Sequence, residues 1–288
     1  APRAGRPIVV SAVCARDRAR DRGVDLSAIP WCEAAADLAA RPDVDVLVEL
    51  IGGAEGTARE AVEAALAAGK PVVTANKALL ARHGVRLARL AEETGAPLLF
   101  EAAVAGAIPA IRTVRDALAG DAVERVEGIL NGTCNYILTR MEAEGLDFAT
   151  CLADAQRLGY AEADPTFDVD GFDTAHKLAL LTSLAFGTEI DADAIFVEGI
   201  RSIEPADLEA ARELGYRIKL LGIASRAEDG IDQRVHPTMV PRGSGLAETS
   251  GVLNAVAFRA AAAGGIVLSG AGAGGAATAS AVLSDLVD

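Results

Sequence analysis

Apolar runs and amphipathic segments alternate through the first third of the chain. The apolar runs have the length and β-branched content of buried strands, and the segments between them have helical spacing. Strands are predicted at 7–14, 43–51, 70–75 and 96–101, and helices at 32–40, 57–68 and 79–94. Continuous apolar strands separated by helices predict a parallel sheet covered on both faces. The fold class is therefore α/β, with a Rossmann-like doubly wound parallel sheet.

The glycine fingerprint of such a fold is not found near the start of the sequence. A dinucleotide-binding fold opens with a strand, a G-x-G-x-x-G turn and a helix. This sequence starts at what corresponds to the second strand of that unit. We therefore expect the first β-α unit to be missing here, and we expect a protein that begins at Ala1 to bind a dinucleotide weakly.

After residue 109 helices and strands are mixed. Helices are predicted at 108–118, 136–144, 148–158, 173–186, 206–213 and 278–287, and strands at 122–130, 218–225, 231–240, 252–259 and 266–269. This pattern predicts a second, α+β domain over 109–270 with antiparallel strands. Residues 1–108 together with 271–288 would form the first domain.

Composition favours a small-molecule partner in the cytoplasm. The net charge of −14 argues against nucleic acid, because phosphate contacts need clustered Lys and Arg. No apolar run approaches the roughly 20 residues that cross a bilayer. Cys14, Cys32, Cys134 and Cys151 lack metal-ligand spacing, so we interpret them as buried free thiols in a reducing compartment.

The segment 159–177, GYAEADPTFDVDGFDTAHK, carries the strongest chemical signal. Five carboxylates precede one lysine, and they are Glu162, Asp164, Asp168, Asp170 and Asp173. Asp173 and Lys177 lie one helical turn apart, and the helix around Lys177 is apolar. A buried lysine is costly unless it is paired, so this pair is a candidate acid/base site. The alternative is a solvated acidic loop.

Three further segments have both a functional and a structural interpretation. Thr74, Asn76 and Lys77 follow a predicted strand, where Lys77 could reach a ligand, or where Asn76 could simply cap a helix. Glu101 precedes small residues whose carbonyls could bind Na⁺ or K⁺, or it could cap the next helix. Cys134 could be a nucleophile, but no histidine shares a motif with it, so packing is the better interpretation.

Six blocks in order along nearly the whole chain resemble homoserine dehydrogenases. They are VELIGG (48–53), GKPVVTANKALLA (69–81), EAAVAGAIP (101–109), NGTCNYIL (131–138), LGYAEADPTFDVDGFDTAHKLALL (158–181) and GAGAGGAATASAVLSDL (270–286). The resemblance implies interconversion of L-homoserine and L-aspartate 4-semialdehyde with NADP or NAD, on the route to threonine, methionine and isoleucine, in a homodimer. The first domain would then bind NAD(P), and the second would bind substrate and form the dimer.

The resemblance also implies roles for single residues. Lys177 would be the acid/base residue, with Asp173 beside it. Substrate would be held by Gly159, Glu162, Asp168 and Lys77, and the cofactor by Lys77, Asn76, Thr74, Gly274 and Arg16; Glu101 with the backbone oxygens of Val104, Gly106 and Ile108 would bind the monovalent cation. Two other functions stay open, namely a semialdehyde dehydrogenase that uses Cys134 as a thioester nucleophile, and a catalytically incompetent dimerising fragment.

Overall fold

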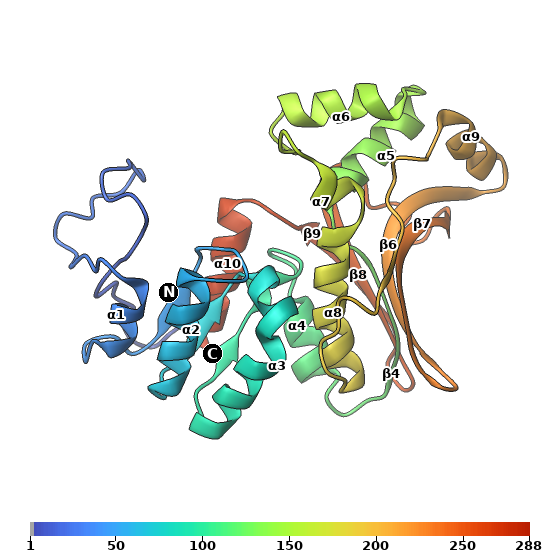
Figure 1. Cartoon of the computed structure of the whole chain (residues 1–288). Coiled ribbons are helices and arrows are strands. Elements are labelled where there is room, and N and C mark those ends of the chain that lie inside the picture. Colours follow the sequence, from blue (N-terminus) through green and yellow to red (C-terminus); the bar gives the residue numbers. More distant parts are fainter. Residues whose placement is uncertain (1–2) are drawn as a thin grey trace. The chain divides into compact units, whose positions relative to one another are not determined.

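The computed structural model describes residues 3–288 and divides the chain into two compact units (Figure 1). Unit 1 comprises Ala1–Ala103 and Ala279–Asp288, and unit 2 comprises Val104–Thr278. Each unit has its own sheet, which confirms the predicted α/β class with a parallel sheet and a second domain. Among the described helices, none combines the length and the apolarity that a bilayer crossing requires.

Unit 1 is built on a three-stranded parallel sheet with its helices between the strands in sequence. The strands β1 (Leu47–Glu49), β2 (Val72–Thr74) and β3 (Leu98–Leu99) lie in the order β1-β2-β3. The helices are α1 (Ala35–Ala40), α2 (Thr57–Ala67) and α3 (Lys77–Thr94). The central strand is completely buried, as the continuous apolar run predicted. The strands are shorter than predicted because the chain leaves the sheet early, as at the exposed Leu50 and Ile51.

The predicted strand at 7–14 is wrong. This segment is irregular, and its pairing is a single parallel bridge between Val13 and Trp31. Val9 and Val10 are 76% and 58% exposed, so their side chains have no sheet face to pack against. A strand needs a hydrogen-bonded neighbour along its whole length as well as β-branched residues, and within the described residues this segment is paired at Val13 alone.

Unit 2 contains a six-stranded sheet in the order β5-β7-β6-β4-β8-β9. Its strands are β4 (Val123–Ile129), β5 (Phe196–Val197), β6 (Tyr216–Ala227), β7 (Gly230–Pro241), β8 (Leu253–Ala260) and β9 (Gly264–Ala271). Neighbouring strands from β7 to β9 are antiparallel, as predicted, whereas the short β5, which was not predicted, joins β7 in parallel.

The helices of unit 2 are α4 (Ala110–Arg112), which continues into the wider turn η2 (Thr113–Ala117), α5 (Gly132–Glu144), α6 (Phe148–Arg157), α7 (Thr166–Val169), α8 (Phe172–Phe186) and α9 (Pro205–Glu213). Helix α8 runs along the sheet, whereas α5, α6 and α9 lie near its upper end in the view of Figure 1. Helix α8 packs closely on β6 because Gly222 has no side chain. A Cβ at this position would lie only 3.2 Å from the Thr174 side chain. On the opposite face of β6, Leu221 and Ile223 belong to a buried apolar cluster.

The last helix, α10 (Gly275–Val287), begins in unit 2, and its residues from Ala279 onward belong to unit 1. There the carboxylate of Asp285, which is 3% exposed, accepts a 2.9 Å hydrogen bond from the backbone N–H of Glu101. Glu101 opens the short helix η1 (Glu101–Ala103), so Asp285 holds the end of the β3 segment in place.

Candidate active site

Helix α8 presents a lysine–aspartate pair that is almost enclosed by protein. Lys177 Nζ donates hydrogen bonds of 2.7 Å to Asp173 Oδ2 and 2.7 Å to the backbone oxygen of Leu130. The two side chains are only 12% and 6% exposed. The spacing of one helical turn, predicted from sequence, therefore forms a close and largely desolvated ion pair. The end of β4 supplies the second acceptor through Leu130.

A neighbouring amide joins this pair to a second carboxylate. Asn131 Nδ2 donates to Asp173 Oδ2 at 2.9 Å and to Asp168 Oδ1 at 2.8 Å. Its Oδ1 accepts the backbone N–H of Cys134 at 2.8 Å, which caps the start of α5. Asn131 is 5% exposed, so its bonds to Asp173 and to Cys134 are buried, and its bond to Asp168 is partly buried. One side chain thus caps a helix and holds two acidic groups in fixed positions.

The remaining carboxylates of the 159–177 segment have separate positions. Asp164 accepts hydrogen bonds from Thr166, whose hydroxyl and backbone N–H lower the pKa of Asp164. Asp170 pairs with Arg201. Both therefore shape the loop around α7. The Gly and Pro residues of this stretch indicate a loop, whereas the structure has the short helix α7 there.

The loop after α6 carries the other residues assigned to substrate. Gly159 has φ 77° and is exposed, and the side chain of Glu162 is exposed as well. The loop is attached to the first turn of α5 by the Thr133 hydroxyl, which donates to the backbone oxygen of Tyr160 at 2.6 Å. Tyr160 also packs edge to face on Tyr136, with ring centroids 5.0 Å apart. Unit 2 thus places an exposed carboxylate loop on the same helix start that carries Asn131.

Cys134 packs and is poorly suited to nucleophilic attack. It is fully buried, and its thiol donates to the backbone oxygen of Asp168 at 3.2 Å. Burial raises the pKa of Cys134 well above its usual value, and the charges of Asp168 and Asp173 add to this effect. An activated cysteine needs the opposite environment. The geometry therefore disfavours the thioester mechanism.

In unit 1 the strand ends are joined by a network of polar side chains. Glu49 accepts hydrogen bonds from the Ile51 and Gly52 backbone N–H groups and, at 2.6 Å, from the hydroxyl of Thr74. Asn76 donates to the backbone oxygen of Gly53 at 2.8 Å, and it caps α3 through the N–H of Leu79.

These bonds tie the turn after β1 to the turn after β2. Thr74 is completely buried, and its hydroxyl contacts both Glu49 and the backbone N–H of Asn76. Lys77 is half-buried at the first residue of α3, and Arg16 is exposed in the irregular segment before α1. The carboxyl ends of parallel strands are where open α/β sheets bind their ligands.

The residues assigned to a monovalent cation are mostly buried. Glu101 is 3% exposed, and Val104 and Ile108 are 1% and 2% exposed. Gly106 has φ 58°, and a Cβ there would lie 2.5 Å from the backbone of Gly272. Ile108 already accepts the backbone N–H of Ala110 at 2.8 Å. Among the described residues no group of three or more His, Cys, Asp or Glu side chains could hold a metal ion.

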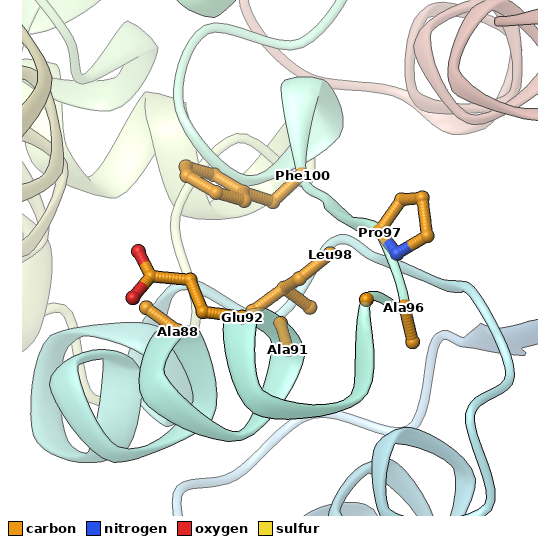
Figure 2. Close-up of a pocket in the computed structure, with 8 residues that line it drawn as sticks. Ala88, Ala91, Glu92, Ala96, Pro97, Leu98 and Phe100 are labelled. Atoms are coloured by element: carbon orange, nitrogen blue, oxygen red, sulfur yellow. The ribbon is translucent and has the colours of Figure 1, made fainter.

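A separate hollow of about 360 Å³ lies in unit 1 beside the last turns of α3 (Figure 2). Its wall includes Ala88, Ala91, Leu98 and Phe100, and Glu92 is its one acidic residue. It follows the C-terminal half of α3, whereas Lys77 is the first residue of that helix. This hollow is therefore distinct from the polar network at the strand ends.

Family models cover both units. One described as "Homoserine dehydrogenase, NAD binding domain" matches residues 2–101, and one described as "Homoserine dehydrogenase" matches residues 109–287. This chain belongs to the homoserine dehydrogenase family. The resemblance stated from the six sequence blocks is thereby confirmed.

Several members of the family are similar over the whole chain. The homoserine dehydrogenase of Neisseria gonorrhoeae is 47% identical over 99% of this chain and 65% of its own length, and that of Mycobacterium tuberculosis (strain ATCC 25618 / H37Rv) is 50% identical over 100% and 66%. A crystal structure of a homoserine dehydrogenase from Thiobacillus denitrificans has a TM-score of 0.95 at 47% identity, covering 99% of this chain and 66% of that one. The chain thus spans 65% or 66% of the length of these three relatives.

A more distant relative was solved with a dinucleotide. It is a hyperthermophilic archaeal homoserine dehydrogenase in complex with NADPH, with 29% identity and a TM-score of 0.77 over 88% of this chain and 74% of that one.

The site of this homoserine dehydrogenase family member contains one residue whose role is larger than the sequence predicts. The residue patterns considered above assign Asn131 no role, and the structure shows that its side chain caps α5. Its amide contact with Asp173 spans 42 positions in sequence, so no local pattern could reveal it. The available signal was a helix-capping asparagine directly after a buried strand, where strand-end residues converge on ligands.

Proposed function

We propose that this protein catalyses the NAD(P)-dependent interconversion of L-homoserine and L-aspartate 4-semialdehyde. Family membership supports the reaction class. The observation that carries the proposal is the desolvated contact of Lys177 with Asp173, since Nζ and Oδ2 are 2.7 Å apart and both side chains are nearly buried. A lysine held in this way on an apolar helix is typical of a group that moves protons.

Lys177 acts as the base when the alcohol is oxidised. It takes the hydroxyl proton, and it returns a proton to the carbonyl oxygen when the semialdehyde is reduced. Asp173 and the backbone oxygen of Leu130 each accept a hydrogen bond from the Lys177 amine. The third hydrogen position of the amine therefore points in a defined direction. NAD(P), when bound, supplies or accepts the hydride.

The strand-end turns of unit 1 support a cofactor site there. Gly52 and Gly53 have φ of 85° and 83°, and no atom lies within 4 Å of a Cβ placed on either. A turn of this kind leaves the backbone open to a close approach by a ligand. Asn76, Lys77 and the loops fastened by Thr74 would border the nicotinamide end, Gly274 would come close to the cofactor, and Arg16 would favour NADP by meeting a 2′-phosphate.

Substrate would be held by the carboxylates of unit 2. Glu162 is an exposed anion and suits the ammonium group of homoserine, while Asp168, fixed by Asn131, offers a second acceptor. Gly159 supplies the tight turn before Glu162, and Lys77 would lie where substrate and nicotinamide meet. The domain made of 1–108 and 271–288 would thus serve the cofactor, and 109–270 the substrate.

The assembly and its surroundings follow from the same assignment. We propose a cytoplasmic homodimer that takes a small-molecule substrate, with neither nucleic acid nor membrane as partner. A Na⁺ or K⁺ ion would be bound by Glu101 and the backbone oxygens of Val104, Gly106 and Ile108, because carboxylate and carbonyl oxygens are the ligands that hard cations prefer.

The test is an assay of homoserine oxidation with NAD⁺ and with NADP⁺, each in sodium and in potassium salts, with L-serine as a matched alcohol one methylene shorter. The proposal expects turnover of homoserine and little of serine. Absence of turnover in every combination, in folded protein, would favour the catalytically incompetent dimerising fragment. Turnover that depends on Cys134 and persists without Lys177 would favour the cysteine mechanism.

A further inference from the structure

Strand β6 contains a lysine that is buried as deeply as the core. Lys219 is 2% exposed and is one of the largest fully buried side chains of the chain. Its neighbours on the same face of the strand, Leu221 and Ile223, belong to the apolar cluster. A charge in such a place costs several kcal/mol unless it is compensated, so its retention calls for a physical reason.

The Lys219 amine is bound by neutral oxygens. Nζ donates at 2.9 Å to Asn135 Oδ1 and at 2.7 Å to the backbone oxygen of Thr249. Within the described residues it forms no ion pair with a carboxylate. The same Asn135 donates from Nδ2 to the backbone oxygens of Thr249 and Leu253 at 3.2 and 3.0 Å. Lys219 and Asn135 together fasten the first turn of α5 to β6, to the loop after β7 and to the start of β8.

This fastening is continuous with the candidate active site. The backbone N–H of Asn135 donates to the backbone oxygen of Asn131 at 3.2 Å. Asn131 in turn holds Asp173 and Asp168, and Asp173 holds Lys177. Every member of the chain of bonds from Lys219 to Asp173 is at most 5% exposed. Water therefore offers few alternative partners along this chain of bonds.

We propose that Lys219 is a positioning residue for the reaction, which it serves through Asn135 by holding the first turn of α5 so that Asn131 keeps Asp173 and Lys177 in place. This inference rests on the proposed function. It goes beyond it by assigning a role to a lysine outside the site, on a different element from each of the groups that it orients.

The charge state of Lys219 is consistent with this role. Burial, together with the nearby charge of Arg217, lowers the pKa of Lys219 to about 8, while Glu142 on α5 and Glu248 in the loop after β7 oppose the shift. A neutral amine still has two N–H groups for its two acceptors. The positioning therefore survives deprotonation, and it depends on the donors of Lys219 more than on its charge.

The experiment compares four variants. Lys219→Met keeps the length of the side chain and removes its donors, and Asn135→Ala removes the acceptor. The other two are the double variant Lys219→Met/Asn135→Ala and Lys219→Arg. Arg226→Met is the matched control, because it removes an exposed cation from the same strand. Lys219→Met and Asn135→Ala are each expected to lower kcat for homoserine oxidation about tenfold, since a displacement of the order of 1 Å costs that much or more. KM for homoserine should change less than kcat, because the exposed side chain of Glu162 forms no bond in this chain, although its loop is attached to α5 through Thr133.

The double variant is expected to be no worse than the poorer single variant, since both cut one connection. Lys219→Arg should recover most of kcat, and Arg226→Met should match the wild type. Multiplicative losses in the double variant, or an unchanged kcat in Lys219→Met with only reduced stability, would overturn the inference. If Lys219→Met does not fold, the kcat of Asn135→Ala decides in the same way.

A readout independent of turnover separates this inference from the proposed function. The backbone N–H groups of Cys134 and Asn135 both donate to Asn131. Their hydrogen exchange should accelerate at least tenfold in Lys219→Met and not in Arg226→Met. If the wild type fails to oxidise homoserine, the proposed function fails, and the exchange rates still decide whether Lys219 holds α5. Unchanged exchange in Lys219→Met would contradict it.

Discussion

Replacing Asn131 by aspartate changes one NH₂ group into an oxygen and leaves the shape of the side chain almost unaltered. In Asn131→Asp the new carboxylate would still accept the backbone N–H of Cys134, so the helix cap survives. The two donors to Asp168 and Asp173 would become an acceptor that faces both carboxylates at the present separations of 2.8 and 2.9 Å. The perturbation is therefore confined to the contact between residue 131 and the acidic groups.

The magnitude follows from the two lost hydrogen bonds. A hydrogen bond to a charged group contributes about 1.5–3 kcal/mol, so losing two costs roughly 3–6 kcal/mol. Partial protonation of the new carboxylate limits any further cost, because like charges raise its pKa above the unfolded value. We expect the free energy of unfolding to fall by about 3–5 kcal/mol at pH 7.5.

The pH dependence has a definite sign. A group whose folded pKa is raised favours the folded state below its unfolded pKa, and this advantage is lost as pH rises through the folded pKa. The difference in free energy of unfolding between Asn131→Asp and the wild type should therefore be largest at pH 8 and should shrink as the pH falls toward 4.5.

The assay is urea unfolding followed by far-ultraviolet circular dichroism across this pH range. Asn131→Ser is the matched control, because serine keeps a capping oxygen and adds no charge. The reasoning would be refuted if Asn131→Asp were within 0.5 kcal/mol of the wild type at pH 7.5, or if the gap widened on acidification.

Other expectations concern side chains of unit 2 around this network. Cys134→Ala should keep kcat within twofold, and the wild-type thiol should resist thiol reagents until the protein unfolds; activity abolished in a folded variant would contradict the assignment. Because the pKa of Lys219 is lowered to about 8, the unfolded state binds more protons above that pH, so stability should rise between pH 8 and 10 relative to Lys219→Met, by up to about 3 kcal/mol in urea titrations. Gly272→Ala would place a Cβ 2.0 Å from the amide carbon of Asn254, which is 1% exposed, and should lower the melting temperature by several degrees, whereas Gly265→Ala, in open space, should not.

Features that depend on local spacing were predictable from the sequence. The pairing of Asp173 with Lys177 follows from one helical turn, and the Asn76 cap follows from its place after a buried strand. The helices of unit 2 and its antiparallel strands agree with the apolar periodicity within a few residues. The burial of Cys134 was also expected, since no histidine shares a motif with it.

Features that depend on long-range contacts were not predictable. The bonds from Asn131 to Asp173 and from Lys219 to Asn135 connect residues 42 and 84 positions apart. Lys219 did carry a signal, because it interrupts an otherwise apolar predicted strand, but its acceptors could not be read from that strand. The strand predicted at 7–14 was wrong for a related reason. Its apolar content indicated a strand, but a strand also needs a neighbouring strand, and whether one is present depends on the tertiary structure.

The central claim is that Lys177 moves the proton. Its most direct test is kcat for homoserine oxidation in Lys177→Met, with Lys70→Met as the matched control, because the Lys70 amine donates to the backbone oxygen of Arg41 within unit 1. We predict a loss of about 10²–10⁴-fold in kcat for Lys177→Met with a folded protein, and no change beyond twofold for Lys70→Met. A folded Lys177→Met protein whose kcat stayed within threefold of the wild type would contradict the account.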